Sequence, residues 1–170
     1  KVYGYGIKSF TLSMIETAIE LTEGRISGRE IQSILNLAKQ MVSADIQLLP
    51  HVAEAIPQLA AHTPLMIITK GDLLDQEAKI AKSGLGPYFR HIEIVSHETI
   101  LNRHGITPER FLMVGNSLPS DILPVLEMGG HGVHIPYHIT WAHEAAAAPS
   151  PDHPRFHQLE HLGQLLGLIG

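Results

Sequence analysis

Apolar residues follow a helical spacing in the first part of the chain. Over residues 9–21 they recur at the three- and four-residue intervals of one helix face, and Gly24 follows as a stop signal, which predicts a helix. Ser27, with Glu30 three residues later, has the spacing of an N-terminal capping box. This box predicts a second helix that runs to about Val42, so the segment forms a helical hairpin.

The pattern changes further along to short apolar runs that alternate with helical periods. Such runs are typical of parallel strands that are buried on both faces. Their alternation with helices of about ten residues predicts repeated βαβ units and an α/β fold on a doubly wound parallel sheet. The predicted strands are 64–69, 91–95, 111–115 and 132–136, and the predicted helices are 52–61, 73–83, 118–128 and 157–168.

Composition narrows the class of protein. The chain has 170 residues, of which 44% are hydrophobic and 17% charged, as in one soluble globular domain with a small attachment. The absence of cysteine excludes a disulfide framework and a cysteine nucleophile, and it fits a reducing cytoplasm. The apolar runs are too short to span a bilayer, and a net charge of −5 with scattered basic residues argues against nucleic acid as a partner. We therefore expect a cytoplasmic protein whose main partner is neither nucleic acid nor a membrane.

Polar residues follow the strand predicted at 64–69, at its carboxyl end. In an open α/β sheet, ligands bind at this edge. The Thr69 hydroxyl, the Lys70 ammonium and the N–H groups of a turn at Gly71 would point to one place, and this set suits an anion, most naturally phosphate. The alternative is that Thr69 caps the following helix and Lys70 is solvated. The spacing alone leaves both interpretations open.

A second polar cluster follows the strand predicted at 111–115. Gly115 allows a sharp turn of the backbone, and Asn116 and Asp121 stand close to the strand end with a helix start between them. Oxygen ligands in such a place suit Mg²⁺. The alternative is that Asn116 or Ser117 caps the helix and Asp121 interacts with the helix dipole.

Together, and in this order on successive strands, the two clusters resemble the haloacid dehalogenase-like (HAD) hydrolase superfamily. The resemblance covers about residues 49–136 and implies that Thr69 binds the transferring phosphoryl group and that Asn116 and Asp121 hold Mg²⁺. It also implies a partial helical cap over residues 1–45, which sets substrate choice, and a Rossmann-like α/β core over residues 46–170. The stretches that carry it are Ile67-Ile68-Thr69-Lys70-Gly71, Ser83-Gly84-Leu85, Tyr88-Phe89 and the segment from Phe111 to Ile122.

Three features depart from the family's pattern. The family's nucleophile, the first Asp of an Asp-x-Asp motif, has no counterpart here, and the family's lysine is missing where Glu98 runs straight into Thr99. We expect both segments to belong to a longer chain of which these residues are the ordered parts. The rival is a truncated protein without catalysis. In addition, Asn116 stands where an Asp would give Mg²⁺ a full charge.

The resemblance implies a Mg²⁺-dependent phosphatase that acts on a small phosphorylated metabolite through an aspartyl-phosphate. Dehalogenation of a 2-haloacid uses the same nucleophile without metal and is the enzymatic alternative, because Asn116 weakens the case for a metal. A HAD-fold binding module without catalysis is an alternative of a different class, and it applies if the chain is complete. The histidines near the carboxyl end, of which His131 and His134 flank a predicted strand, are interpreted as surface groups rather than a metal site.

Overall fold

The structure, a computed structural model, describes residues 3–4, 6–69, 73–94, 96–137 and 146–169. Helices alternate with strands that pair in parallel, so the predicted α/β class is confirmed. The chain forms two compact units: the first contains residues 1–47 and 67–94, and the second contains residues 48–66 and 95–170. The division into a cap over residues 1–45 and a core over residues 46–170 stays a prediction.

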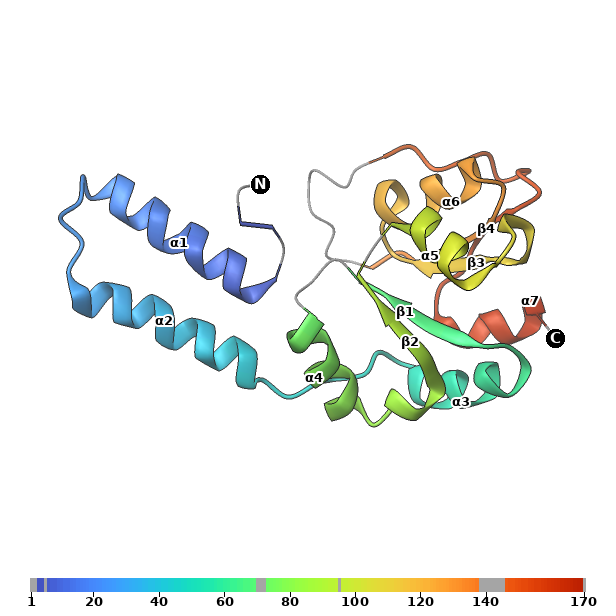
Figure 1. Ribbon diagram of the computed structural model, residues 1–170, viewed down its shortest axis with the longest axis horizontal. Helices are drawn as coiled ribbons and strands as arrows, with labels where there is room; N and C mark the ends of the chain where they lie inside the picture. Colours follow the sequence, from blue (N-terminus) through green and yellow to red (C-terminus); the bar gives the residue numbers. More distant parts are fainter. Residues whose placement is uncertain (1–2, 5, 70–72, 95, 138–145, 170) are drawn as a thin grey trace. The chain divides into compact units, whose positions relative to one another are not determined.

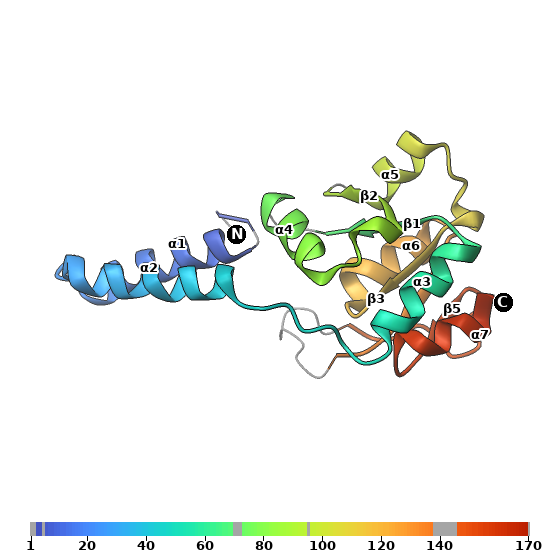
Figure 2. The same ribbon diagram turned by 90° about the horizontal axis from the view of Figure 1, so that it is seen from below.

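The first unit begins with two antiparallel helices that lie side by side (Figures 1 and 2). They are α1 (Ile7–Leu21) and α2 (Gly28–Ser43), close to the predicted ranges. Thr11 is the one buried residue of α1, and α2 has none. Large apolar side chains such as Phe10 and Leu12 are about half exposed. With little buried surface, this pair depends on its caps and its turn.

The first helix ends in a Schellman motif. The N–H of Glu23 donates to the carbonyl oxygen of Glu20 at 3.0 Å, and the N–H of Gly24 donates to the carbonyl oxygen of Ile19 at 2.8 Å. Gly24 was the expected stop signal, but the left-handed position directly after the helix cap belongs to Glu23, with φ of 52°. Gly24 continues the turn with φ of 78°.

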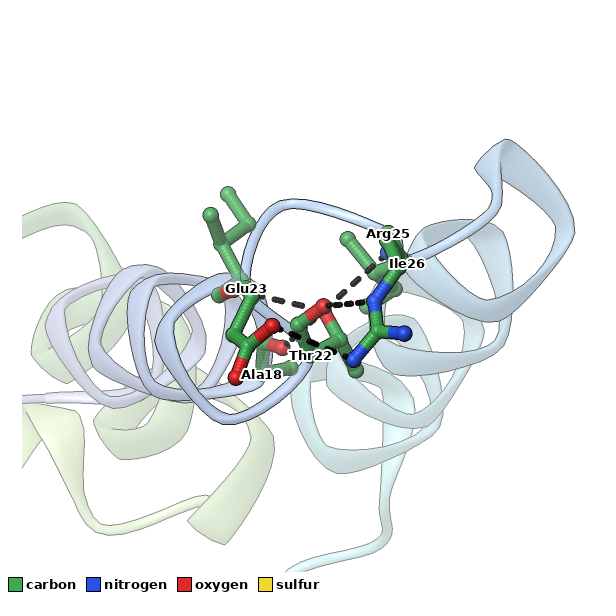
Figure 3. Close-up of polar contacts among 6 residues, drawn as sticks. Ala18, Thr22, Glu23, Arg25 and Ile26 are labelled. Carbon is green, nitrogen blue, oxygen red and sulfur yellow. Dashed lines mark hydrogen bonds and ion pairs between the residues drawn. The ribbon is translucent and has the colours of Figure 1, made fainter.

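The same turn is closed by side-chain hydrogen bonds around Thr22 (Figure 3). The Thr22 hydroxyl donates to the carbonyl oxygen of Ala18 at 2.8 Å and accepts the N–H of Ile26 at 3.0 Å. Arg25 donates to the Thr22 carbonyl oxygen at 3.1 Å and to the carboxylate of Glu23 at 3.3 Å. These bonds hold the end of α1 to the approach of α2.

The predicted capping box at the start of α2 is confirmed. The Ser27 hydroxyl accepts the N–H of Glu30 at 3.3 Å, and the Glu30 carboxylate accepts the N–H of Ser27 at 2.8 Å. Each side chain therefore satisfies a backbone donor that the helix leaves without a partner.

The rest of the first unit contains α4 (Leu73–Ser83), the 3₁₀ turn η1 (Gly86–Tyr88) and strand β2 (Phe89–Glu93). Strand β1 (Leu65–Ile68) pairs with β2, and its last two residues belong to this unit. Gly84 ends α4 with φ of 73°, as its expected role as a helix cap requires. Strand β2 begins and ends two residues before the predicted range of 91–95.

A three-stranded parallel sheet forms the second unit. Its strands are β3 (Leu112–Gly115), β4 (His131–His134) and β5 (Phe156–Gln158), with β4 in the middle. The helical elements are α3 (Val52–His62), α5 (His97–His104), η2 (Pro108–Arg110), η3 (Leu118–Ile122), α6 (Leu123–Glu127), η5 (Leu162–Leu165) and α7 (Leu166–Ile169). Of these, η3 is a turn of π-helix and η2 and η5 are 3₁₀ turns.

Strand β4 is covered on both faces. Val133 is fully buried in a cluster with Leu59 and Leu165. Gly132, the neighbour of Val133, faces the opposite side of the sheet. It lies so close to η3 that a Cβ atom there would be 2.8 Å from Ile122 Cγ2. The sheet is therefore packed between helices on two sides, as a doubly wound fold requires.

The prediction of a final helix over residues 157–168 is wrong for the first residues of that range. Phe156 is buried, and residues 156–158 pair with β4 as strand β5, in the register Gly132↔Phe156. Helical structure begins only at η5. The open edge of β4 offers hydrogen-bond partners to the backbone of residues 156–158. In addition, Gly163 and Gly167 each make a helix less stable by about 1 kcal/mol relative to alanine.

Among the residues that the structure describes, no helix combines the length and the apolar character needed to cross a bilayer.

Replacing Ser27 by Ala should lower the free energy of unfolding by about 1 kcal/mol, because the N–H of Glu30 loses its acceptor. Urea denaturation followed by circular dichroism measures this loss. Ser33→Ala is the matched control, since the Ser33 hydroxyl donates to the Arg29 carbonyl oxygen within the same helix and caps nothing. Equal losses in the two variants would contradict the capping role.

The hydrogen bonds that the Glu30 carboxylate receives from the N–H and the hydroxyl of Ser27 hold the pKa of this exposed group below its ordinary value of 4.5. Because the folded pKa is depressed, the stabilisation is present above the ordinary value and is lost as the pH falls through the folded pKa. In an NMR titration, Ser27→Ala should raise the pKa of Glu30 part of the way back, since the backbone donor remains. An unchanged pKa would show that the Ser27 hydroxyl does not stabilise the carboxylate.

Candidate functional site

Asp121 belongs to η3, the turn of π-helix within the loop that follows β3, and this loop holds its side chain at the carboxyl end of the strand. Its Oδ2 atom accepts the N–H of Ser117 at 3.1 Å, and its Oδ1 atom accepts the hydroxyl of Ser120 at 2.6 Å. The N–H of Asp121 in turn donates to the carbonyl oxygen of Ser117 at 2.9 Å. These bonds fix the orientation of the carboxylate, and each carboxylate oxygen keeps a further lone pair for a ligand.

Gly115, the last residue of β3, is required by close packing. A Cβ atom there would lie 2.6 Å from Asp121 Cβ, and the carboxylate would be in its way as well. The sequence suggested that Gly115 allows a sharp turn, but its φ does not fall in the left-handed region. Its role is to let the Asp121 side chain lie directly against the end of the strand.

Asn116 and Ser117 differ in their exposure. Asn116 is exposed, and its main-chain carbonyl oxygen accepts a hydrogen bond from Nε2 of His134 at 3.1 Å. Ser117 is buried, and its Oγ atom has no hydrogen-bond partner among the described residues. Ser117 precedes η3 but its side chain does not cap that turn, so the capping alternative is wrong for this residue.

The oxygen donors on this loop fit a hard cation that keeps most of its water. They are the Asp121 carboxylate, the Asn116 side-chain oxygen and the buried Ser117 hydroxyl that lacks a partner in the described chain. Mg²⁺ usually binds to proteins through one or two carboxylates and retains several waters. Over the described ranges, no group of three or more His, Asp or Glu side chains could hold a metal ion. The donor set therefore suits a hydrated Mg²⁺ better than a metal enclosed by protein ligands.

Thr69, in the first unit, directly follows β1. Its N–H donates to the carbonyl oxygen of Glu93 at 3.0 Å, which continues the pairing of β1 with β2 by one residue. The Thr69 side chain is half-buried, and α4 begins only at Leu73. Thr69 thus lies at the carboxyl end of its strand, as predicted. Lys70 and Gly71, the other predicted phosphate-binding residues, lie outside the described residues.

Asn116 and Asp121 belong to one loop of the second unit, and the hydrogen bond from the Ser117 N–H to the Asp121 carboxylate lies within this loop. Thr69 belongs to the other unit. The assignment of phosphate binding to Thr69 and of metal binding to Asn116 and Asp121 stays a prediction.

His134 also lies in this region, although its pattern in the sequence was interpreted as that of a surface group. It ends β4, it is 9% exposed, and it contacts the main chain of a candidate ligand. The rule that points to Thr69 and Asn116, a polar residue at the carboxyl end of a buried strand, points to His134 too. Its interpretation as a surface group is wrong.

Two hollows are lined by residues of the first unit. One, of about 450 Å³, is lined by α4 and the end of α2, and includes Asp75, Lys79 and Lys82. The other, of about 470 Å³, is an apolar groove between α1 and α2. Neither is lined by Thr69, so neither marks the predicted phosphate site.

The chain is similar to solved structures of HAD-like hydrolases. A haloacid dehalogenase-like family hydrolase from Xanthomonas campestris is 39% identical, with a TM-score of 0.86, over 98% of this chain and 73% of that one. A predicted phosphoglycolate phosphatase from Haemophilus somnus is 18% identical, with a TM-score of 0.68, over 98% of this chain and 79% of that one. A 2-haloacid dehalogenase from Pseudomonas syringae is 18% identical, with a TM-score of 0.59, over 87% of this chain and 65% of that one.

No protein-family model matches the sequence, and no curated protein matches it either. The identity to the Xanthomonas hydrolase and its coverage of both chains are sufficient to show the family. The chain belongs to the haloacid dehalogenase-like hydrolases, and the resemblance noted in its motifs is confirmed. The two neighbours at 18% identity show the shared fold alone.

Gly115→Ala should lower the free energy of unfolding by about 1 to 3 kcal/mol, since the added methyl group overlaps the Asp121 side chain. Thermal and urea denaturation measure this change. Gly28→Ala, at the start of α2, is the control: its Cβ meets no atom within 4 Å, and alanine favours the helix. A Gly115→Ala protein as stable as the wild type would contradict the close packing.

Proposed function

We propose that this HAD-like hydrolase is a Mg²⁺-dependent phosphatase that acts on a small phosphorylated metabolite. The observation that carries the proposal is the hydrogen-bonded Asp121 carboxylate, which lies against Gly115 at the carboxyl end of β3. A carboxylate at this edge, with the amide of Asn116 on the same loop, is the type of donor set that Mg²⁺ prefers.

Each residue of the proposal has a separate task. Asp121 and Asn116 would hold the cation, which when bound supplies charge neutralisation for phosphate oxygens. The Thr69 hydroxyl would donate to a phosphoryl oxygen from the end of β1, with the Lys70 ammonium contributing positive charge and the main chain of Gly71 an N–H group. The carboxylate nucleophile that the family implies has no matching position in these residues. The proposal therefore concerns the groups that bind and orient the phosphate.

Asn116 favours a second candidate, hydrolysis of a 2-haloacid without metal. An amide oxygen carries no net charge, so Asp121 is the one carboxylate on this loop that could neutralise a divalent cation. The fold does not choose between the two chemistries, because neighbours named as a phosphatase and as a dehalogenase share it.

The two candidates differ in their response to metal. With p-nitrophenyl phosphate as substrate, and with the family's nucleophile present in the protein assayed, we expect turnover that needs Mg²⁺ and stops with EDTA. Asp121→Asn should reduce this turnover by more than the roughly 10- to 100-fold typical of losing an outer-sphere partner of a metal. Asp152→Asn, a change of the same chemistry at an exposed position, is the control and should leave turnover unchanged.

Turnover of a 2-haloacid that is insensitive to EDTA would overturn the phosphatase proposal in favour of the dehalogenase. Absence of turnover with either substrate class would contradict both candidates and leave a binding module as the function.

A further inference from the structure

The His134 side chain makes a hydrogen bond that reaches across the sheet. Its Nε2 atom lies 3.1 Å from the main-chain carbonyl oxygen of Asn116, which is eighteen residues away in the chain. A carbonyl oxygen can only accept, so Nε2 carries the proton and donates it. The bond therefore ties the end of β4 to the first residue after β3.

Strand register explains why the two residues meet. Gly115 and His134 are partners in the parallel pairing of β3 with β4, and the N–H of Ile135 donates to the carbonyl oxygen of Gly115 at 2.9 Å. This backbone bond is the last one of the pairing. The His134 side chain supplies the next bond, to Asn116, where the chain has left the strand. The pairing is thus extended by one residue, into the loop that carries the candidate metal ligands.

Packing alone does not account for an imidazole at this position. His134 is 9% exposed, and its Nδ1 atom is buried without a hydrogen-bond partner among the described residues. An apolar side chain of similar size would fill the same space and leave no buried polar atom unsatisfied. The imidazole gains one hydrogen bond over such a side chain, and that bond goes to Asn116.

We propose that His134 is a positioning residue, which holds the main chain of Asn116 so that the oxygens of Asn116 and Asp121 are preorganised for one cation. The inference deepens the proposed function and rests on it for the identity of the cation. The hydrogen bond of Ser117 to Asp121 lies within the same loop, so release of Asn116 should also loosen that bond.

Three variants separate the hydrogen bond from the packing. His134→Leu removes the donor, and His134→Gln keeps an N–H group that can reach the same carbonyl oxygen. His131→Leu removes an imidazole from the other end of β4 and is the matched control. Hydrogen exchange at the N–H of Ser117, measured by NMR without metal, reports on the loop. Calorimetric titration with Mg²⁺ reports on cation affinity, and exchange in α3 reports on global stability.

We expect His134→Leu to exchange the Ser117 N–H about three- to tenfold faster, with α3 unchanged, and to bind Mg²⁺ roughly 10- to 100-fold more weakly. His134→Gln should restore both values toward the wild type, and His131→Leu should leave them unchanged. Unaltered exchange in His134→Leu, or equal losses in the Gln and Leu variants, would overturn the positioning role.

Failure of the proposed function is a separate result. If the wild type binds no Mg²⁺, the metal assignment fails, and the exchange of Ser117 then decides by itself whether His134 holds the loop. Faster exchange in His134→Leu that is rescued by Gln supports the positioning role even then, and unchanged exchange overturns it.

Discussion

Strand β4 pairs in parallel with β3 on one side and with β5 on the other, and the second unit is built around this arrangement. Its alternate residues face opposite layers of helix: Val133 packs with Leu59 and Leu165, while Gly132 leaves room for Ile122. A side chain at Gly132 would collide with η3, so the close approach of helix and sheet requires glycine there. Burial on both faces then holds the strand and its register in place.

The register of β4 against β3 also sets the geometry of the candidate site. It places His134 beside Gly115, within reach of the main chain of Asn116. The glycine at the end of β3 admits the Asp121 side chain, and local hydrogen bonds then fix its carboxylate. The hydrogen bonds of the Asp121 carboxylate therefore depend on the absence of a side chain at Gly115, because they can form only where the glycine leaves space.

Family membership and chemistry rest on different evidence in this protein. Identity of 39% along almost the whole chain shows that it is a HAD-like hydrolase. Structures named for phosphate ester and for haloacid chemistry share the fold, so the fold cannot choose between them. In the function proposed above, this choice depends on the charge at Asn116 and Asp121. The substrate class is therefore inferred from the charge of these side chains rather than from the overall similarity of the fold.

Local signals in the chain were enough to predict the α/β class, the capping box at Ser27 and the glycine that ends α4, because each depends on residues close together in sequence. Motif order on successive strands was enough to predict the family. The strand at Phe156 was missed, since its partner is the distant edge of β4. The contacts of Gly115 with Asp121 and of His134 with Asn116 likewise appear only when the strands are in register. Tertiary pairing decides such features, because a buried backbone or side-chain polar group takes the partner that the fold brings to it.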